Sequence, residues 1–558
     1  MQANQMTRAA PVLCLFSFVF SPSAWADRPA QPEVLTNPEV NEALHADVSA
    51  PLREMATPPR ADTPRRVIPI RRPKLQQTMN AAAVPSQAAS DDGALQTAIL
   101  PTVLAVPGVN VLGVGNGFGS YKVQGAPSDA NLAVGDTQVV QWVNLQYAVF
   151  DKSSGAVLAG PFDGNNFWKG FGNICETANQ GDPIIQFDKL AHRWVASQGT
   201  FNVRVTCIAV STTPDALGTY YRFAYGQNSF PDYPKFGIQP NGYFQSINSF
   251  TNDGSRYVGA TVCAYDRVGM LAGRKSAKQV CFTTPTTFDD SLLPADLDSA
   301  DVLPPSGQPE VFLGSIDNTP PNGNVIYKYL FDIDFARPRN ATFTGIGGTM
   351  PIPVANFQLA CGGDRACIPQ PDAEPGTDTL DSLGDRLMYR LAYRNFSDHQ
   401  SWVVSHSVNT PTGQVGERWY EFRAPKNSTV LTVYQQGTYA PPDGDHRWMG
   451  SIAMDKAGNI ALGYSVSGPV RPGGSSTFPS IRYTGRTSLD PLGAMETESF
   501  LINGTGSQLK CGGRWGDYTS MAIDADGCTF WYTNQYYLTT STFNWSTRVA
   551  SIRFPDCQ

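Results

Sequence analysis

Acidic residues recur ahead of short apolar segments, and their side chains could serve acid–base chemistry. The clearest copies are Gly181–Trp194, Asp445–Asp455 and Arg514–Asp524, in which an acidic residue near Gly or Pro accompanies an apolar segment and a polar turn. Copies of this kind indicate a structural unit that is repeated along the chain. With weaker copies included, seven acidic anchors follow one another roughly 50–80 residues apart: Asp129, Asp182, Asp232, Glu310, Asp385, Asp445 and Asp517.

The anchors would bring carboxylates together if the segments behind them surround a common axis. Two carboxylates that flank a glycosidic bond can act as general acid and as base or nucleophile. The alternative is structural, because an aspartate ahead of a strand can accept hydrogen bonds from neighbouring backbone N–H groups. The candidates for the catalytic roles are Asp182, Asp232, Asp385, Asp445 and Asp517.

Cationic and aromatic residues beside these anchors would bind the substrate. An arginine can hold a sugar carboxylate through two parallel hydrogen bonds. In a lyase, an arginine would neutralise a uronate while a tyrosine or histidine removes the neighbouring proton. These residue types favour a glycoside hydrolase or polysaccharide lyase, and a non-catalytic adhesin or glycan- or protein-binding propeller is the alternative. The candidate substrate-binding residues are Lys235, Arg390, His446, Arg447, Arg514, Tyr233 and Tyr518.

Short segments rich in aromatic and β-branched residues would form the strands that position these side chains. Examples are Val139–Asn144, Trp194–Ser197, Trp402–Ser405 and Thr529–Thr533. Such runs, bounded by turn-forming residues, are typical of β-strands. Helical periodicity is weak and is confined to Pro294–Ala300. The fold class is therefore predicted to be all-β.

The spacing of the anchors favours a β-propeller. A four-stranded blade takes about 40–50 residues, so the observed spacing leaves room for loop insertions. We expect seven blades, with five or six as alternatives and an array of β-sandwiches as the less favoured architecture. Turns such as Asp524–Gly527 suit hairpins, because the Gly can adopt a positive φ and the Asp can bond the turn's own backbone.

The sequence contains no clear cofactor motif, and Ca²⁺ is the cofactor considered. The Asp-rich turns Asp443–Asp445 and Asp524–Gly527 offer oxygen ligands for Ca²⁺, but neither is an EF-hand loop. A turn that bonds only its own backbone is the favoured interpretation. The sequence has neither a G-x-S-x-G elbow nor an H-E-x-x-H zinc motif. A four-histidine iron site is not favoured, because the first histidine of the set falls in a predicted hairpin turn: His192, His399, His406 and His446.

Four segments also resemble a known group of proteins: Asp182–Trp194, Pro231–Lys235, His446–Gly450 and Arg514–Tyr518. They are similar to secreted bacterial β-propeller-like proteins of the sialidase-like superfamily that have no established function. The resemblance covers about Asp129 to Tyr537 and implies a propeller in an extracellular bacterial protein. It implies no particular reaction, and the Ser-x-Asp-x-Gly-x-Thr-Trp boxes of sialidases are absent.

The N-terminal residues are typical of export. Arg8 precedes an apolar run from Ala9 to Phe20 and a small-residue cleavage pattern that ends at Ala26. This pattern predicts a secretory signal peptide over residues 1–26. The run is too short to cross a bilayer, which takes ~20 residues. No other segment could serve as a transmembrane anchor.

The next segment, residues 27–108, is rich in Pro and Ala and has no strand or helix period. It is predicted to be a disordered linker or propeptide ahead of a propeller domain at residues 109–558. Its basic run, Arg65–Lys74, is interpreted as a solvated arm. A tether to an anionic surface and a processing site are the alternatives.

Charge and cysteine content restrict the partners and the compartment. The formal net charge of −7 argues against a nucleic-acid partner. In an oxidising compartment the nine cysteines beyond Cys14 should be mostly paired. We expect a secreted or extracellular monomer that meets an extracellular polysaccharide or cell-surface glycan, with the periplasm or cell surface as alternative locations. Adjacent pairing would give Cys175–Cys207, Cys263–Cys281 and Cys361–Cys367, with Cys511, Cys528 and Cys557 competing for one bond.

Overall fold

The structure is a computed structural model, and residues 32–558 form one compact unit within it, distinct from residues 1–31. Apart from Met1, the predicted signal peptide lies outside the described residues. The structure describes residues 1, 31–55, 57, 65–68, 71, 73, 92–119, 121–172, 174–201, 203–314, 323–363, 365–374, 376–471 and 476–558. No helix in these ranges is long and apolar enough to cross a membrane.

The described part of the chain is all-β and consists mainly of successive antiparallel four-strand units. The first is β7 (Asn131–Val134), β8 (Gln138–Val143), β9 (Gln146–Asp151) and β10 (Val157–Asp163). The second is β11 (Ile184–Asp188), β12 (Arg193–Thr200), β13 (Val205–Ser211) and β14 (Tyr220–Gly226). The third is β15 (Phe230–Gln239), β16 (Gly242–Phe250), β17 (Tyr257–Tyr265) and β18 (Lys278–Thr283).

Two further units merge into one larger sheet, because β19 pairs in parallel with β26. The fourth unit is β19 (Leu293–Leu297), β20 (Glu310–Gly314), β21 (Gly323–Asp332) and β22 (Thr342–Thr344). The fifth is β26 (Met388–Asn395), β27 (His399–Asn409), β28 (Val415–Pro425) and β29 (Thr432–Tyr439). Strand β23 (Pro351–Leu359) pairs with β21 and β27, which closes a circuit of six strands through β19, β20, β21, β23, β27 and β26.

The last two units complete the arrangement. The sixth is β30 (His446–Met454), β31 (Ile460–Ser467), β32 (Ser480–Arg486) and β33 (Ser499–Ile502). The seventh is β34 (Ser520–Ile523), β35 (Thr529–Tyr537), β36 (Trp545–Arg553) and β5 (Val106–Gly113). Its outer strand, β5, precedes all the other strands of these units in the chain and pairs with the C-terminal strand β36.

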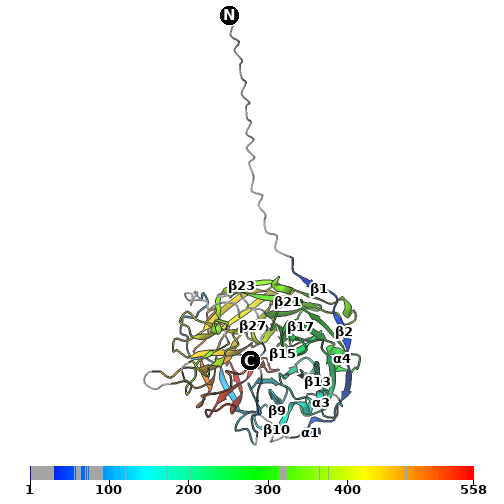
Figure 1. The fold of residues 1–558 in the computed structure, drawn as a ribbon, viewed down its shortest axis with the longest axis horizontal. Helices are drawn as coiled ribbons and strands as arrows, with labels where there is room; N and C mark the ends of the chain where they lie inside the picture. The colour runs from blue at the N-terminus through cyan, green and yellow to red at the C-terminus, as the bar shows by residue number, and fades with distance from the viewer. Residues whose placement is uncertain are drawn as a thin grey trace. The chain divides into compact units, whose positions relative to one another are not determined.

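The first strands of the units form a ring within residues 32–558. β7, β11, β15, β19, β26, β30 and β34 each contact the next one, and β34 contacts β7. Figure 1 shows the sheets arranged around this ring. The arrangement is propeller-like, as the sequence predicts, and it brings the starts of these strands toward one axis.

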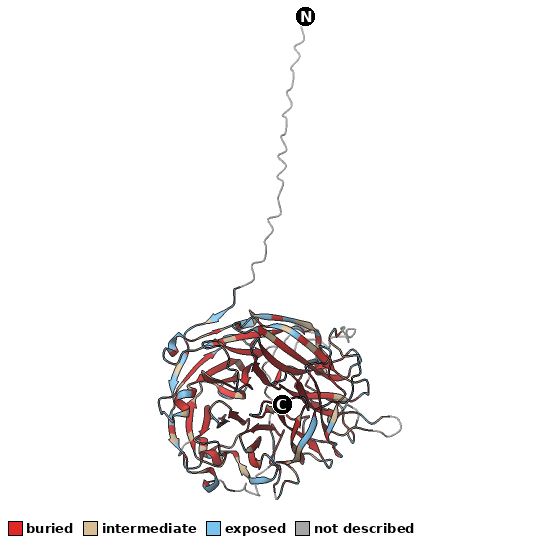
Figure 2. Ribbon diagram, turned by 180° about the vertical axis from the view of Figure 1, so that it is seen from behind, coloured by how far each residue is buried: buried red, intermediate tan, exposed pale blue. Residues whose placement is uncertain are grey.

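Many strands of the units are buried on both sides. Every residue of β11, β13 and β31 is buried, and Figure 2 shows the buried strands surrounded by exposed loops and edges. Sheets that pack face to face leave no solvent-facing side, so the runs are apolar or aromatic rather than strictly alternating. The predicted runs Val139–Asn144, Trp194–Ser197, Trp402–Ser405 and Thr529–Thr533 fall in β8, β12, β27 and β35.

One sequence expectation fails in this core. Strand β19 (Leu293–Leu297) overlaps the segment of weak helical character, Pro294–Ala300. It pairs with β20 on one side and β26 on the other. Every residue of the strand is buried, so the sheet pairings on its two sides outweigh a local periodicity.

The segment expected to be a disordered linker also contains strands. β3 (His45–Val48), β2 (Glu39–Glu42) and β1 (Val34–Leu35) extend the outer edges of the second, third and fourth units through pairing with β14, β18 and β22. These short strands keep most of their side chains at least partly exposed. Their order comes from backbone hydrogen bonds to open sheet edges, and such bonds leave no hydrophobic period in the sequence.

The remaining described elements are short. β4 (Arg66–Val67) pairs in parallel with β6 (Gly125–Ala126), and β24 (Ala366–Ile368) pairs with β25 (Leu380–Asp381). The helices are α1 (Leu52–Met55), α3 (Ile174–Thr177), α4 (Arg267–Leu271), η1 (Gly164–Trp168), η2 (Pro338–Asn340), η3 (Ile346–Gly348) and η4 (Ala360–Gly363).

Four disulfides link the described cysteines. Cys175–Cys207, Cys263–Cys281 and Cys361–Cys367 are the predicted adjacent pairs. Of the three cysteines that competed for one bond, Cys528 and Cys557 are joined. Cys511 is a buried free thiol, and burial raises its pKa to about 11.

Candidate functional site

A left-handed residue lies at the inner end of most sheets. Such a conformation is uncommon outside glycine, and aspartate tolerates it better than most residues. It turns the chain where the innermost strand begins. The residues with this positive φ are Asp129 (46°), Asp182 (49°), Tyr233 (52°), Ser291 (49°), Met449 (58°) and Asp517 (58°).

Several of the predicted residues meet in one pocket at this end of the ring. Asp182 precedes β11, Asp232 and Tyr233 lie on β15, and Asp517 and Arg514 precede β34. A register shift between Asp232 and Lys235 marks a bulge in β15 where these side chains are presented. The pocket is small, with a cavity volume of about 20 Å³, and is lined by Ile68, Arg71, Asp182, Asp232, Tyr233, Arg365, Leu383, Arg386, Arg514 and Asp517.

Asp517 is held by arginines. Arg514 donates from both terminal nitrogens to its two carboxylate oxygens, with 2.5 Å between Nη2 and Oδ2. Arg365 lies 3.7 Å from the same carboxylate. Burial alone would raise the pKa of Asp517, but Arg514 and then Arg365 outweigh it and hold the pKa below its usual value. This carboxylate is therefore ionised at neutral pH.

The pKa of Asp232 is shifted in the opposite direction, upward. Its side chain is 17% exposed, and its ion pair in the described structure is with Arg71 at 3.6 Å. Burial and the nearby Asp182 raise the pKa of Asp232 to about 7, although Arg71 opposes the shift. Burial also raises the pKa of Asp182, whose carboxylate accepts a hydrogen bond from the Tyr233 backbone N–H at 3.1 Å.

A buried lysine lies beside these carboxylates. Lys235 is fully buried, with its Nζ 3.4 Å from the ring centroid of Tyr233 and 4.0 Å from that of Tyr518. Its Nζ donates to the Pro234 carbonyl at 3.0 Å. Burial lowers the pKa of Lys235 to about 7, against the pull of the nearby aspartates. The two tyrosine rings thus provide much of the environment of this ammonium group.

Asp129 belongs to the same group, although it was predicted only as an anchor. It is fully buried, and neither carboxylate oxygen has a hydrogen-bond partner within the described structure. Burial, then Asp517 and Asp182, raise the pKa of Asp129 well above its usual value, so its acid form is favoured. The spacing of Asp129 ahead of β7 matches that of Asp182 ahead of β11, which is the signal that could have placed it in the site.

Asp385 contributes through its neighbour. Arg386 binds it through Nε–Oδ1 and Nη2–Oδ2 contacts of 2.9 and 3.0 Å. The Arg386 guanidinium in turn lies 4.5 Å from the ring centroid of Tyr233. Asp385 itself does not line the pocket, and Arg386 is the residue that does. Arg386, Arg365 and Arg71 also line the pocket, although they were not among the residues predicted from the sequence.

Arg390 lies in a different cluster. It sits on β26 and is bound to Asp296 at 3.1 Å and to Asp298 at 2.7 Å. Lys189 also binds Asp298, at 3.1 Å. A second cavity inside the ring is lined by Lys189, Asp296 and Arg390, and these charges neutralise one another.

Asp445, His446 and Arg447 do not line the pocket that contains Asp232 and Asp517. Asp445 is paired with Arg471, and Arg447 is paired with Asp443 and with Glu498 next to the outer strand β33. The left-handed residue of β30 is Met449, within a bulge between Trp448 and Ser451. The inner turn of this sheet thus comes several residues later than the sequence pattern suggested. Burial lowers the pKa of His446 to about 4.

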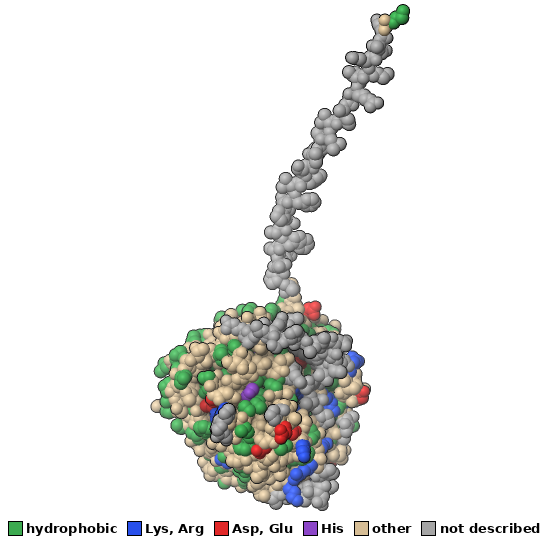
Figure 3. All heavy atoms as spheres, turned by 60° about the vertical axis from the view of Figure 1, so that its left-hand side comes forward, with side chains coloured by type: hydrophobic (Ala, Val, Ile, Leu, Met, Phe, Trp, Pro, Cys, Tyr) green, Lys and Arg blue, Asp and Glu red, His purple; other side chains and the backbone are tan. Residues whose placement is uncertain are grey.

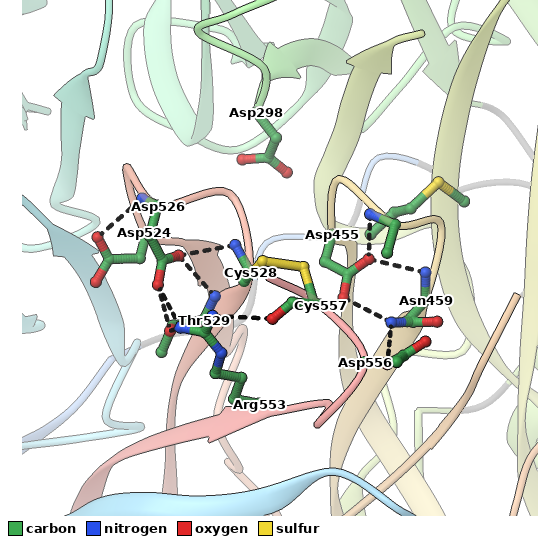
Figure 4. Close-up of a disulfide and its surroundings, with 12 residues drawn as sticks. Asp298, Asp455, Asn459, Asp524, Asp526, Cys528, Thr529, Arg553, Asp556 and Cys557 are labelled. Carbon is green, nitrogen blue, oxygen red and sulfur yellow. Dashed lines mark hydrogen bonds and ion pairs between the residues drawn. A yellow bond between two sulfur atoms is a disulfide. The ribbon is translucent and has the colours of Figure 1, made fainter.

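The turns considered for Ca²⁺ bond their own chain. Asp526 accepts hydrogen bonds from the backbone N–H groups of Cys528 and Thr529 at 2.7 and 2.8 Å (Figure 4). Asp443 binds Arg447 instead. No group of three or more His, Cys, Asp or Glu side chains suited to a metal ion occurs within the described ranges.

On the face shown in Figure 3, charged side chains form small groups among hydrophobic and neutral ones.

Comparison with known proteins adds little to this geometry. No protein-family model matches the chain, and no curated protein matches it. The N-terminal domain of Nup159 is similar at 10% identity, with 84% of this chain and all of that chain covered and a TM-score of 0.34. The WD40 domain of SCAP from fission yeast is similar at 7% identity, with 75% and 82% covered and a TM-score of 0.31.

An α-L-arabinanase of Penicillium chrysogenum, complexed with arabinobiose, is similar at 8% identity. The match covers 59% of this chain and 94% of that chain, with a TM-score of 0.28. Scores this low support no inference about activity. The propeller-like architecture therefore rests on the strand pairings and the ring of inner strands.

Proposed function

We propose that this chain is a secreted, seven-bladed β-propeller protein that hydrolyses glycosidic bonds of an extracellular polysaccharide. The ring from β7 to β34 supports the blade count, and the four disulfides are compatible with an oxidising compartment. One observation carries the activity: Asp232 and Asp517 line the same pocket and have opposite pKa shifts.

Asp232 would act as the general acid. With a pKa of about 7 it keeps a proton on a substantial fraction of molecules at neutral pH and can protonate the oxygen of the leaving sugar. Asp517 would remain an anion and stabilise the positive charge that develops on the sugar ring. Two carboxylates whose surroundings separate their pKa values in this way are the pattern used by glycosidases.

Hydrolysis is better supported than elimination. A lyase needs a base, but burial raises the pKa of both Tyr233 and Tyr518, so their phenols hold their protons. Arg390, a candidate partner for a uronate, and His446, a candidate base, do not line this pocket.

Glycan binding without cleavage is a second candidate function. The observation that favours it is that Arg514 and Arg386 are already engaged by Asp517 and Asp385 and have side chains only 4% and 3% exposed. A pocket whose charges are neutralised internally is suited to a neutral sugar ring.

The test is an activity screen of the purified mature protein on neutral and uronic polysaccharides, following reducing ends and the absorbance of unsaturated products. We expect reducing ends without unsaturated products, and a rate that falls as the pH rises above about 7, because Asp232 loses its proton. Asp232→Asn should lower kcat by about 100-fold or more. Asp526→Asn is the matched control, since Asp526 lies in an exposed turn away from the pocket lining.

Three outcomes would contradict this proposal. Wild-type kcat in Asp232→Asn would exclude the general acid assigned here. Unsaturated products would indicate a lyase. No activity on any polymer, together with retained glycan binding, would favour the second candidate function.

A further inference from the structure

The pocket beside Asp232 and Asp517 is lined in part by residues from the N-terminal segment. Ile68 and Arg71 line it together with Asp182, Asp232 and Asp517. Both come from the basic run that the sequence singled out, far from the strands that build the pocket. We use the name strap for Arg65–Ile68 together with Arg71.

The strap is attached on one side by backbone hydrogen bonds. Strand β4 within it pairs with β6, through Arg66 N–H to Gln124 carbonyl at 3.0 Å and Ile68 N–H to Ala126 carbonyl at 2.8 Å. Side chains of Arg65, Arg66 and Val67 are exposed. The attachment therefore buries little apolar surface.

On its inner side the strap engages the residues assigned to chemistry. The Ile68 carbonyl accepts a hydrogen bond from Arg514 Nε at 2.9 Å, and Arg514 is the residue that holds Asp517. Arg71 lies 3.6 Å from the carboxylate of Asp232 and 4.2 Å from the ring centroid of Phe230. One short segment thus contacts Asp232 directly and Arg514, the partner of Asp517.

We propose that the strap is an inhibitory cover, and that it must move away before a polysaccharide can reach Asp232 and Asp517. The inference rests on the function proposed above only in taking these two carboxylates as the groups that a substrate must reach. A sugar ring needs the space beside Asp232 that the Arg71 guanidinium occupies.

The contacts are of a kind that can be released. The Arg71 and Asp232 side chains are 24% and 17% exposed, and ion pairs open to water are weak. Other carboxylates near the pocket are bound by arginines of the ring itself: Asp517 by Arg514, and Asp385 by Arg386. Release of the strap would leave those pairs intact and free Asp232.

The experiment uses the full mature chain with Arg71→Glu, which places a negative charge against Asp232. Arg71→Lys keeps the charge, and Arg337→Glu is the matched control, because Arg337 is an exposed arginine paired with Asp334 three residues earlier. Hydrogen exchange of a peptide that contains the Arg66 and Ile68 amides reports attachment of the strap. Labelling of Asp232 by a carbodiimide and glycine ethyl ester, read by mass spectrometry, reports access to the pocket.

We expect Arg71→Glu to raise the exchange rate of these amides and the labelling of Asp232 by about tenfold, the scale of one part-exposed ion pair plus one cation–π contact. Labelling of the exposed Asp334 should not change. Arg71→Lys and Arg337→Glu should match the wild type in the exchange of these amides and in the labelling of Asp232. Unchanged labelling of Asp232 in Arg71→Glu, or an equal increase in Arg337→Glu, would overturn the proposal.

Activity then separates this inference from the proposed function. If the polysaccharide screen finds a substrate, Arg71→Glu should raise kcat/KM severalfold, and an unchanged kcat/KM would overturn the inhibitory role. If the screen finds no substrate but Asp232 labelling rises as expected, the cover is supported and the hydrolase assignment fails.

Discussion

The disulfide between Cys528 and Cys557 should contribute more to stability than the Cys361–Cys367 disulfide, which closes a much shorter loop. Cys528 lies in the turn between β34 and β35, and Cys557 follows β36 (Figure 4). The bond spans 29 residues, whereas Cys361–Cys367 spans 6. Loop-closure entropy of the unfolded chain gives about 3.6 kcal/mol for the longer loop and about 2.2 kcal/mol for the shorter one.

The comparison uses two double variants, Cys528→Ala/Cys557→Ala and Cys361→Ala/Cys367→Ala. Each loses two sulfur atoms, so the expected difference in unfolding free energy, about 1.4 kcal/mol, comes chiefly from loop length. Cys528 and Cys557 are also the more buried pair, so cavity formation adds in the same direction. Denaturant unfolding followed by tryptophan fluorescence measures both. An equal or larger loss for the Cys361–Cys367 pair would refute the reasoning.

Two further substitutions test buried charges. Asp92→Ala should cost about 3–5 kcal/mol of unfolding free energy, because Arg418 is fully buried and would lose its carboxylate partner. Asp92→Asn keeps a hydrogen-bond acceptor and should cost less. Equal denaturation midpoints of the two variants would contradict this prediction. Burial raises the pKa of Glu417 to about 8, so the folded state keeps a proton that the unfolded chain releases above about pH 4.3. Wild-type stability should therefore fall between about pH 5 and 8, by up to about 1.4 kcal/mol per pH unit. Glu417→Gln should lack this loss, and a variant-to-wild-type difference that is the same at pH 5 and pH 8 in urea titrations would count against the assignment.

The sequence predicted the elements whose side chains decide their conformation. Aromatic and β-branched runs fall in strands because those strands are buried on both sides. The Asp524–Gly527 turn closes as expected, with a φ of 74° at Gly527, whose N–H donates to the Asp524 carbonyl at 2.9 Å. Asp182, Asp232 and Asp517, which share a position close to the start of an inner strand, line one pocket.

Other residues were placed wrongly from the sequence, or were not predicted at all, because their positions depend on backbone geometry that residue types do not reveal. Asp445–Arg447 resembles the other anchors, but the bulge of β30 places the left-handed residue at Met449. Edge strands such as β2 are held by backbone bonds to β18, and their side chains are largely exposed. The approach of Arg71 to Asp232 joins residues 161 positions apart by number, which no local pattern can indicate.

The pairing of β5 with β36 sets an order for biogenesis. Residues 106–113 are synthesised long before residues 545–553, so β5 must wait for the last part of the chain before it can pair. The seventh unit is therefore completed only when synthesis is nearly finished, and the ring remains open until then. Long-range pairing of this kind is slow to form, so the ring closes late in folding.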